Sequence, residues 1–252
     1  FAAWVWQRRR GLDAGPALWW MTVWGFAAAR GAFVLKHLDT YLAAPLTLLD
    51  IRDGGFFLWP GVIAVVIGAL VRGWKRPILR TPLGLGVGSG LFFWGLASLA
   101  LHAHHEDARL PDLTLRNANG NAVQLRDYQG KPLVINLWAT WCPPCRREMP
   151  VLQAAQQANA NVTFLFVNQA ESPRDVATFL TTQGLHLDNV LFDSAGALAQ
   201  QVGSAALPTT LFYTSDGRLA GNHLGELSSA SLKHALDNLG PPASSLPSRS
   251  TQ

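Results

Sequence analysis

Three long apolar stretches constrain the first hundred residues of this 252-residue chain more than any other feature. They run over about 17–35, 55–71 and 83–101, and a helix needs about 20 apolar residues, with a range of about 17–25, to cross the hydrocarbon core of a bilayer. Residues 1–101 are therefore predicted to form an all-α transmembrane region, with residues 1–7 as the end of an earlier span. The alternative is that the three stretches are buried helices of a soluble domain.

The charged residues are distributed unevenly along the chain. Residues 1–105 contain ten Lys and Arg against four Asp and Glu, whereas residues 106–252 contain ten against twelve. The cations of the first part gather in two short clusters, QRRR at 7–10 and RGWKRPILR at 72–80. Such clusters between apolar runs are typical of loops that flank membrane helices and differ from the basic stripe of a nucleic-acid-binding protein. We therefore expect the lipid bilayer, and no nucleic acid, as a partner.

The positions of these clusters also predict an orientation in the membrane. Short loops rich in Lys and Arg stay on the cytoplasmic side. If the cluster at 7–10 is cytoplasmic, the first span leads outward, the second returns the cluster at 72–80 to the cytoplasm, and the third delivers the rest of the chain outside. In a bacterium that side is the periplasm, where disulfides form and persist. The predicted location is the bacterial inner membrane, as a multi-pass protein with a periplasmic C-terminal domain.

Beyond residue 110 the pattern becomes that of a soluble α/β domain. Alternation around an Asn-Gly pair predicts a hairpin, continuous apolar runs predict buried strands, and Ser and Gly mark helix ends. The expected elements are a hairpin at 113–131, strands within 131–141 and 161–168, helices at 147–160, 172–184, 197–203 and 228–240, and two strands around Asp216-Gly217 within 209–225. A mixed sheet flanked by helices is therefore predicted for 110–240, followed by a disordered Pro- and Ser-rich tail at 241–252.

Both cysteines of the chain lie in the segment WATWCPPCRREMP at 138–150, between a predicted buried strand and a predicted helix. At a helix N-terminus, unpaired backbone N–H groups and the macrodipole stabilise a thiolate, so the pKa of the first cysteine falls below its free value of about 8.5. Cys142 is therefore predicted to be the nucleophile, and Cys145, one turn later, to attack the mixed disulfide that results. A structural disulfide across so short a loop removes little chain entropy, and a zinc site needs four ligands, so we favour redox chemistry over both.

The segments GKPLVINLWATWCPPCRREMP at 130–150 and ALPTTLFYTSDGRL at 206–219 carry a family resemblance. They resemble the thioredoxin fold, and within it the TlpA/ResA group of membrane-tethered periplasmic thioredoxins. The resemblance covers about 109–240. It implies an α/β thioredoxin fold and a thiol-disulfide oxidoreductase whose redox centre is a Cys142–Cys145 disulfide, with no other cofactor.

The resemblance also implies roles for residues around the cysteines. Pro208 matches a cis-proline that faces the pair, and Leu207 contributes the adjacent backbone. Glu148 matches an active-site acid that serves as a proton acceptor for the thiols. Its i, i+3 spacing places Glu148 on the same helix face as Cys145, so that role is geometrically possible. The alternative is a solvated first-turn glutamate stabilised by the helix dipole.

Four further residues lie close to this centre in the sequence pattern. Asn136 occupies the position where cytosolic thioredoxins carry a buried acid, and because an amide takes no proton there, proton transfer shifts to Glu148 or to water. Glu171 matches a recurrent position of the family, with a helix-capping or loop role as the alternative. Trp138 is expected in the core, and Trp141 on the surface that binds the partner protein.

The apolar region bears a second, fainter resemblance. The segments WGFAAARGAFVL, YLAAPLTLLDIRDGGFFLWPG and PLGLGVGSG resemble the N-terminal half of prolipoprotein diacylglyceryl transferases, in the same order and spacing. Arg30 would be a costly charge within a span, and the resemblance gives it a family counterpart. However, Leu58-Trp59-Pro60-Gly61 stands where the transferases have His-Gly-Gly. Residues 1–101 are therefore predicted to be a degenerate transferase-like scaffold that anchors the thioredoxin-like domain.

A short histidine-rich segment, HAHHED at 102–107, lies within the predicted linker 102–109. Imidazole and carboxylate groups bind copper and zinc. His102, His104 and His105 are therefore candidate metal ligands, and the alternative is a polar linker at the membrane interface.

The predicted function is that of a membrane-anchored periplasmic thiol-disulfide oxidoreductase that reduces disulfides of specific periplasmic proteins. Residues 1–101 contain no cysteine, so thiol electrons cannot cross the bilayer through them. A separate membrane donor of the DsbD/CcdA kind is therefore expected as a partner. Two alternatives remain open, a copper- or metal-handling protein that uses HAHHED and an active lipoprotein diacylglyceryl transferase.

Overall fold

The computed structural model describes residues 15–43, 54–106, 108–204 and 206–239, and of residues 101–106 it describes the backbone alone. The chain divides into two compact units, Phe1–Ala103 and His104–Gln252. The predicted end of an earlier span at 1–7 and the predicted disorder of 241–252 lie outside the described residues.

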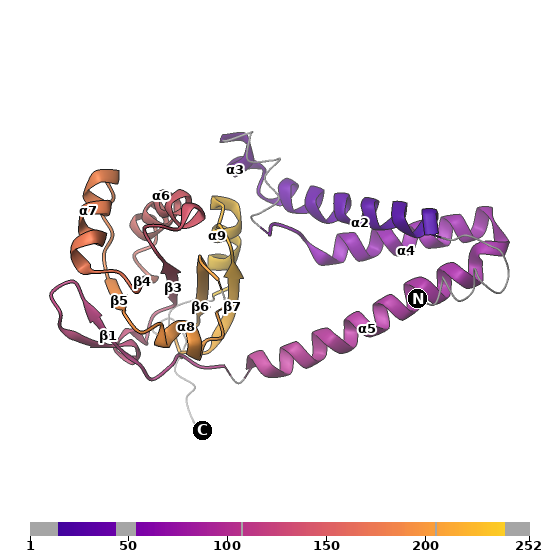
Figure 1. Cartoon of the computed structure of the whole chain (residues 1–252). Helices are drawn as coiled ribbons and strands as arrows, with labels where there is room; N and C mark the ends of the chain where they lie inside the picture. The colour runs from indigo at the N-terminus through magenta and orange to yellow at the C-terminus, as the bar shows by residue number, and fades with distance from the viewer. Residues whose placement is uncertain (1–14, 44–53, 107, 205, 240–252) are drawn as a thin grey trace, which may run out of the picture. The chain divides into compact units, whose positions relative to one another are not determined.

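The described residues of the N-terminal unit lie mostly in helices (Figure 1). Within the described residues, three segments are long and apolar enough to cross a membrane, Gly15–Lys36, Leu58–Lys75 and Pro77–Ala100. The predicted length and composition of the spans are thereby confirmed. The elements in chain order are α2 (Gly15–Lys36), α3 (Leu38–Ala43), α4 (Leu58–Lys75), the 3₁₀ helix η2 (Pro77–Leu79) and α5 (Arg80–Glu106).

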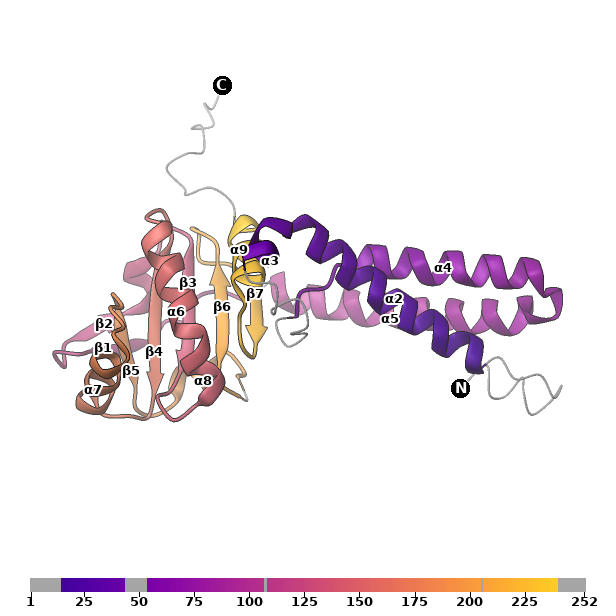
Figure 2. The same ribbon diagram turned by 90° about the horizontal axis from the view of Figure 1, so that it is seen from above.

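Helices α2 and α4 approach closely at two glycines. Figure 2 shows α2 crossing α4 obliquely. A Cβ atom added at Gly61 would lie 2.9 Å from the carbonyl oxygen of Gly25, and one added at Gly25 would lie 2.7 Å from Cγ2 of Val65. Small residues allow helix backbones to come this near, as is common between membrane helices. The two glycines therefore set the separation of the two helices.

The helix boundaries differ from the prediction at three places. Helix α4 begins at Leu58 rather than at 55, since Gly54 has a positive φ of 63° and Phe57 is extended. Helix α3 lies between the first two predicted spans, where no helix was predicted. Helix α5 continues to Glu106, so the backbone of 102–106 is helical where a linker was expected. No Gly or Pro interrupts the chain between Gly95 and Pro111, and Leu, Ala and Glu are strong helix formers.

The C-terminal unit is built on a seven-stranded mixed sheet with the strand order β2-β1-β5-β4-β3-β6-β7. Strands β3, β4 and β5 are parallel, and the remaining pairs are antiparallel. The strands are β1 (Thr114–Asn117), β2 (Ala122–Gln124), β3 (Leu133–Trp138), β4 (Thr163–Gln169), β5 (Val190–Asp193), β6 (Thr209–Tyr213) and β7 (Leu219–Leu224). The helices are the 3₁₀ helix η3 (Leu125–Tyr128), α6 (Pro143–Ala158), α7 (Pro173–Gln183), α8 (Ala197–Gln201) and α9 (Ser229–Asp237).

Alternate residues of β3 supply two apolar cores, one on each face of the sheet. Val134 and Trp138 belong to the core under α6, α7 and α9, whereas Ile135 and Leu137 belong to the core that includes residues of α8 and η3. Figure 1 shows α6, α7 and α9 on one side of the sheet and α8 on the other. A strand buried on both faces is what a continuous apolar run predicts, so the predicted mixed sheet flanked by helices is confirmed.

The serine cap predicted for the last helix and the end predicted at Gly184 are confirmed. Ser172 caps α7 and Ser228 caps α9, because each hydroxyl oxygen accepts a backbone N–H of the first turn. Gly184 ends α7 in the left-handed conformation. Strand β5 was not predicted, since its four residues are too few to produce a recognisable pattern.

Candidate active site

The two cysteines lie where β3 leads into α6. Strand β3 ends at Trp138, and α6 begins at Pro143 with Cys142 as its N-cap. Proline is tolerated at the first helical positions, where the backbone N–H would have no intrahelical partner. Cys142 and Cys145 form a disulfide, with their Cα atoms 5.3 Å apart.

The N-terminus of α6 places a backbone donor on one sulfur. The N–H of Cys145 donates to Sγ of Cys142 over 3.3 Å. Cys142 is 3% exposed and Cys145 is fully buried. In the reduced protein, the same donor and the helix dipole favour a thiolate on Cys142 over one on Cys145.

Glu148 is buried rather than solvated, with no exposed surface at all. The alternative of a solvent-exposed first-turn glutamate is therefore wrong. Helix α6 turns this side chain toward the sheet, on the helix face that also carries Cys145. An acid buried one turn from a cysteine is well placed to exchange protons with it.

Two hydrogen-bond donors hold the Glu148 carboxyl group. Nδ2 of Asn136 on β3 donates to Oε1 over 2.8 Å, and the backbone N–H of Leu227 donates to Oε2 over 2.9 Å. Nδ2 of Asn136 also donates to Oγ1 of Thr210 over 3.0 Å, which ties β6 into the same cluster. Burial raises the pKa of Glu148 to about 7, although the hydrogen bonds from Leu227 and Asn136 oppose that rise. A carboxyl group with this pKa accepts and releases protons at neutral pH.

A second acid, Glu171, fixes the turn that precedes the cysteines. The backbone N–H of Thr140 donates to Glu171 over 2.7 Å, and the Thr140 hydroxyl also donates to its carboxylate. Nδ2 of Asn168 donates to the same carboxylate over 2.6 Å. Because β3 and β4 are parallel, the residues that follow them meet at one edge of the sheet, which explains these contacts between distant parts of the chain. Glu171 is therefore a loop-anchoring acid, the alternative role considered for it.

The remaining candidate residues lie around the same edge. Trp138 is fully buried, as predicted, whereas Trp141 is 67% exposed beside Cys142. The Leu207–Pro208 peptide bond is cis, and Leu207 packs against the core that contains both cysteines. Pro208 is buried immediately before β6, where Thr209 pairs with Leu137 near the end of β3.

Several residues of this site were not singled out from the sequence. Thr140 and Asn168 carry no motif, although each follows or ends a parallel strand, and that position is a usable signal. Leu227 contributes only its backbone N–H, which no side-chain pattern can reveal. Leu224 is an exposed apolar residue at the end of β7, and its neighbour Gly225 donates its N–H to the Pro208 carbonyl over 2.9 Å.

Two further candidate groups come from earlier parts of the sequence. Nη1 of Arg30 donates to the carbonyl of Gly55 over 3.0 Å, and its guanidinium lies over the rings of Tyr41 and Phe56. The side chains of His102, His104 and His105 lie outside the described residues, so their metal binding stays a prediction. Among the residues whose side chains are described, no group of three or more His, Cys, Asp or Glu is placed to hold a metal ion.

The family model for Redoxin matches residues 105–237, which is more than half of the chain. The chain belongs to the redoxin family. This redoxin is 31% identical over 136 residues to the thioredoxin-like protein YneN of Bacillus subtilis, covering 52% of this chain and 79% of YneN. It is 30% identical over 133 residues to the thiol-disulfide oxidoreductase ResA of Geobacillus thermodenitrificans, covering 52% of this chain and 76% of ResA.

A solved thiol:disulfide interchange protein of the thioredoxin family, from Chlorobium tepidum, is 26% identical to this redoxin. Its TM-score is 0.46, and the match covers 53% of this chain and 97% of the other. The family, the relatives and the cysteine pair agree with the resemblance found in the sequence. The redoxin is a thiol-disulfide oxidoreductase with a TlpA/ResA-like thioredoxin fold. The transferase-like character of residues 1–101 lies outside the matched region and stays a prediction.

Proposed function

We propose that this chain is a membrane-anchored reductase of protein disulfides, with Cys142 as its nucleophile and the redoxin unit in the periplasm. The observation that carries the proposal is the position of Cys142 as the N-cap of α6, where its sulfur accepts the N–H of Cys145. That donor stabilises the thiolate required for attack. Cys142 is 3% exposed and Cys145 is fully buried, so Cys142 is the cysteine nearer to solvent and to a substrate protein.

The proposed reaction is a thiol-disulfide exchange in two steps. The Cys142 thiolate attacks one sulfur of the substrate disulfide, forms a mixed disulfide and releases the other substrate sulfur as a thiolate. The Cys145 thiolate then attacks Sγ of Cys142, which releases the second substrate sulfur and leaves the Cys142–Cys145 disulfide. The substrate gains two electrons, and the dithiol loses two.

Glu148 is proposed to manage the protons of these steps. The Cys145 thiol must lose a proton before its attack, and Glu148 lies one turn away on the same face of α6. The ionised carboxylate accepts this proton, and a pKa of about 7 leaves a useful fraction ionised at neutral pH. The hydrogen bonds from Asn136 and Leu227 hold the carboxyl group in place during the transfer.

An apolar surface around the cysteines is proposed to bind the substrate protein. Trp141 precedes Cys142 and is largely exposed, and Leu207 and Pro208 lie near the same edge of the sheet. Exposed aromatic residues beside a reactive group are common anchors of protein partners. The proposed substrates are therefore disulfides of folded or partly folded proteins rather than small disulfides alone.

The three apolar helices and the distribution of basic residues support membrane anchoring and a periplasmic redoxin unit. Arg72, Lys75, Arg76 and Arg80 lie together where α4 leads into α5, which fits a cytoplasmic loop. Residues 1–101 contain no cysteine, so we propose that a separate membrane protein of the DsbD/CcdA kind restores the dithiol.

The reduction potential of the Cys142–Cys145 couple is expected near about −270 mV, because a reductant must hold its electrons less tightly than its substrates do. Equilibration of the full chain with thiol buffers, followed by alkylation and mass spectrometry, measures this potential. A value near about −120 mV belongs to a strong oxidant and would contradict the proposed direction.

Protease added to intact spheroplasts is expected to digest the redoxin unit and to leave the membrane helices. The reason is that the orientation predicted from the basic clusters places the unit outside the inner membrane. Immunoblotting before and after membrane lysis provides the measurement, with a cytoplasmic protein as the control. A redoxin unit that is cut only after lysis would lie in the cytoplasm, contrary to the proposal.

A further inference from the structure

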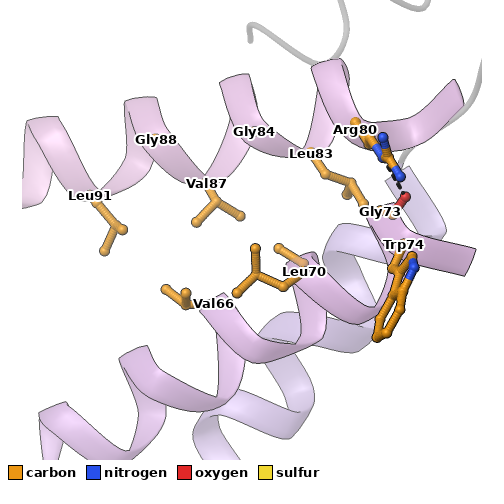
Figure 3. Close-up of a pocket in the computed structure, with 11 residues that line it drawn as sticks. Val66, Leu70, Gly73, Trp74, Arg80, Leu83, Gly84, Val87, Gly88 and Leu91 are labelled. Carbon is orange, nitrogen blue, oxygen red and sulfur yellow. Dashed lines mark hydrogen bonds between the residues drawn. The ribbon is translucent and has the colours of Figure 1, made fainter. Parts of the chain in front are cut away.

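A cavity of about 440 Å³ opens between α4 and α5 in the N-terminal unit. Figure 3 shows Val66 and Leu70 of α4 and Val87 and Leu91 of α5 pointing into the space between the two helices. The lining is almost entirely apolar apart from its end, where Arg80 lies. A cavity of this kind suits a hydrocarbon chain rather than a polar solute.

Four cations lie in residues 72–80, the segment of the chain that forms this end of the cavity. Arg72, Lys75 and Arg76 line a second hollow of about 320 Å³, and their neighbours Gly73 and Trp74 line the first, together with Arg80. All four cations are exposed, and none forms an ion pair with a described residue. Asp39 is the one carboxylate among the described residues of the N-terminal unit, and it lies in α3, away from this turn in the chain. The positive charge at the end of the cavity is therefore not balanced within the described part of that unit.

Arg80 is held at the boundary between the apolar and the basic parts. Its Nε donates to the carbonyl of Gly73 over 3.0 Å, as the dashed line in Figure 3 marks. A guanidinium has five N–H donors, so the four on the two Nη atoms remain for another acceptor. Guanidinium groups bind phosphates in a bidentate manner. Trp74 is 81% exposed beside it, as is typical of tryptophan at the level of lipid headgroups.

Two glycines leave the cavity open. A Cβ atom added at Gly84 or at Gly88 would meet no heavy atom within 4 Å, so helix packing does not require glycine at either position. Glycine inside a helix is destabilising relative to alanine. Both line the cavity, and both widen the space that a ligand can occupy.

We propose that an anionic phospholipid binds at this place, with its phosphate on Arg72, Lys75, Arg76 and Arg80 and one acyl chain in the cavity between α4 and α5. The inference rests on the membrane embedding proposed above. A soluble phosphate would leave the apolar cavity unused, and a neutral lipid would leave the cations unused. A single anionic lipid matches both, and basic sites between helices at the cytoplasmic leaflet bind such lipids.

The test uses the full chain in mild detergent and native mass spectrometry. The probes are phosphatidylglycerol and phosphatidylcholine with identical acyl chains. Phosphatidylglycerol is expected to bind more tightly. The triple variant Arg72→Gln/Arg76→Gln/Arg80→Gln is expected to lose affinity for phosphatidylglycerol on the order of 100-fold, at roughly fivefold for each cation. A triple change of exposed arginines in the redoxin unit, Arg116→Gln/Arg126→Gln/Arg174→Gln, is the charge-matched control.

The cavity itself is tested with a pair of glycine substitutions. Gly84→Leu/Gly88→Leu fills the cavity and is expected to lower affinity for phosphatidylglycerol roughly tenfold, through lost burial of acyl methylenes. Gly90→Leu/Gly95→Leu is the matched control, because an added Cβ atom there also meets nothing within 4 Å and neither residue lines the cavity. This control is expected to keep wild-type affinity.

Three results would overturn the inference. Equal binding of the two lipids would remove the role of the cations, and full binding by Gly84→Leu/Gly88→Leu would remove the acyl chain from the cavity. Competition by glycerol 3-phosphate at the affinity of the lipid would mean that the cations bind a soluble anion instead. Alkaline carbonate extraction separates these results from failure of the membrane proposal, because a chain that the wash releases refutes the embedding and this inference together. A chain that stays embedded but shows any of the three results refutes the lipid site alone.

Discussion

A Cys142→Ser variant is expected to lose all reduction of protein disulfides, and a Cys145→Ser variant is expected to stop at a covalent complex with its partner. The N–H of Cys145 stabilises a thiolate on Cys142, so removal of that sulfur leaves no nucleophile at the start of α6. Without Cys145, no thiolate attacks the mixed disulfide. Insulin reduction measures the first effect, and mass spectrometry of disulfide-linked complexes from the periplasm measures the second.

The control is a comparison of the mixed disulfides that the two variants trap, which tests whether Cys142 attacks the substrate first. The Cys142→Ser variant is expected to form no stable mixed disulfide, because Cys145 is fully buried. Complexes trapped by Cys142→Ser but not by Cys145→Ser would reverse the assignment of the two cysteines. Circular dichroism of both variants and of the reduced wild type separates loss of chemistry from loss of fold.

A Glu148→Gln variant is expected to remove a pH dependence of stability between about pH 4.5 and pH 7. The pKa of Glu148 is raised from 4.5 to about 7 in the folded protein, so the folded state binds the proton more tightly than the unfolded state. The stabilisation is complete below about pH 4.5 and is lost as the pH rises through about 7. The full shift corresponds to about 3 kcal/mol of unfolding free energy, to an order of magnitude.

Urea unfolding of the full chain in detergent, repeated across this pH range, measures the difference between wild type and Glu148→Gln. Asp216→Asn is the control, because hydrogen bonds from Thr214 and Arg218 lower the pKa of Asp216 to about 2 and keep it ionised throughout. Identical pH profiles for wild type and Glu148→Gln would show that Glu148 does not titrate in this range. Its proposed exchange of protons with Cys145 would then be wrong.

The local pattern of the chain predicts most of the redoxin unit. Strands β3 and β4 follow from their apolar runs, and α6 follows from the prolines at its start, since each signal lies within the element itself. Strand β5 has only four residues, and its pairing depends on β4 and β1 rather than on its own sequence. The extension of α5 through Glu106 was missed because polar residues suggested a linker, although nothing among them breaks a helix.

The candidate site shows a similar division between local and distant information. The spacing of Cys142, Cys145 and Glu148 is readable from one helix. The burial of Glu148 cannot be read from that helix. It depends on Asn136 of β3 and on the backbone of Leu227, which lies 79 residues further along the chain. The anchoring of Thr140 by Glu171 likewise joins residues 31 apart.

The contact between Gly25 and Gly61 has a consequence for how this protein varies among its relatives. At Gly61 the opposing atom is a backbone oxygen, which no exchange of side chains can remove, whereas at Gly25 the nearest atom belongs to the side chain of Val65. Gly61 should therefore be invariant wherever this helix pair is inherited. A residue larger than glycine is expected at position 25 only in relatives that carry a residue smaller than valine at position 65, so the two positions should covary.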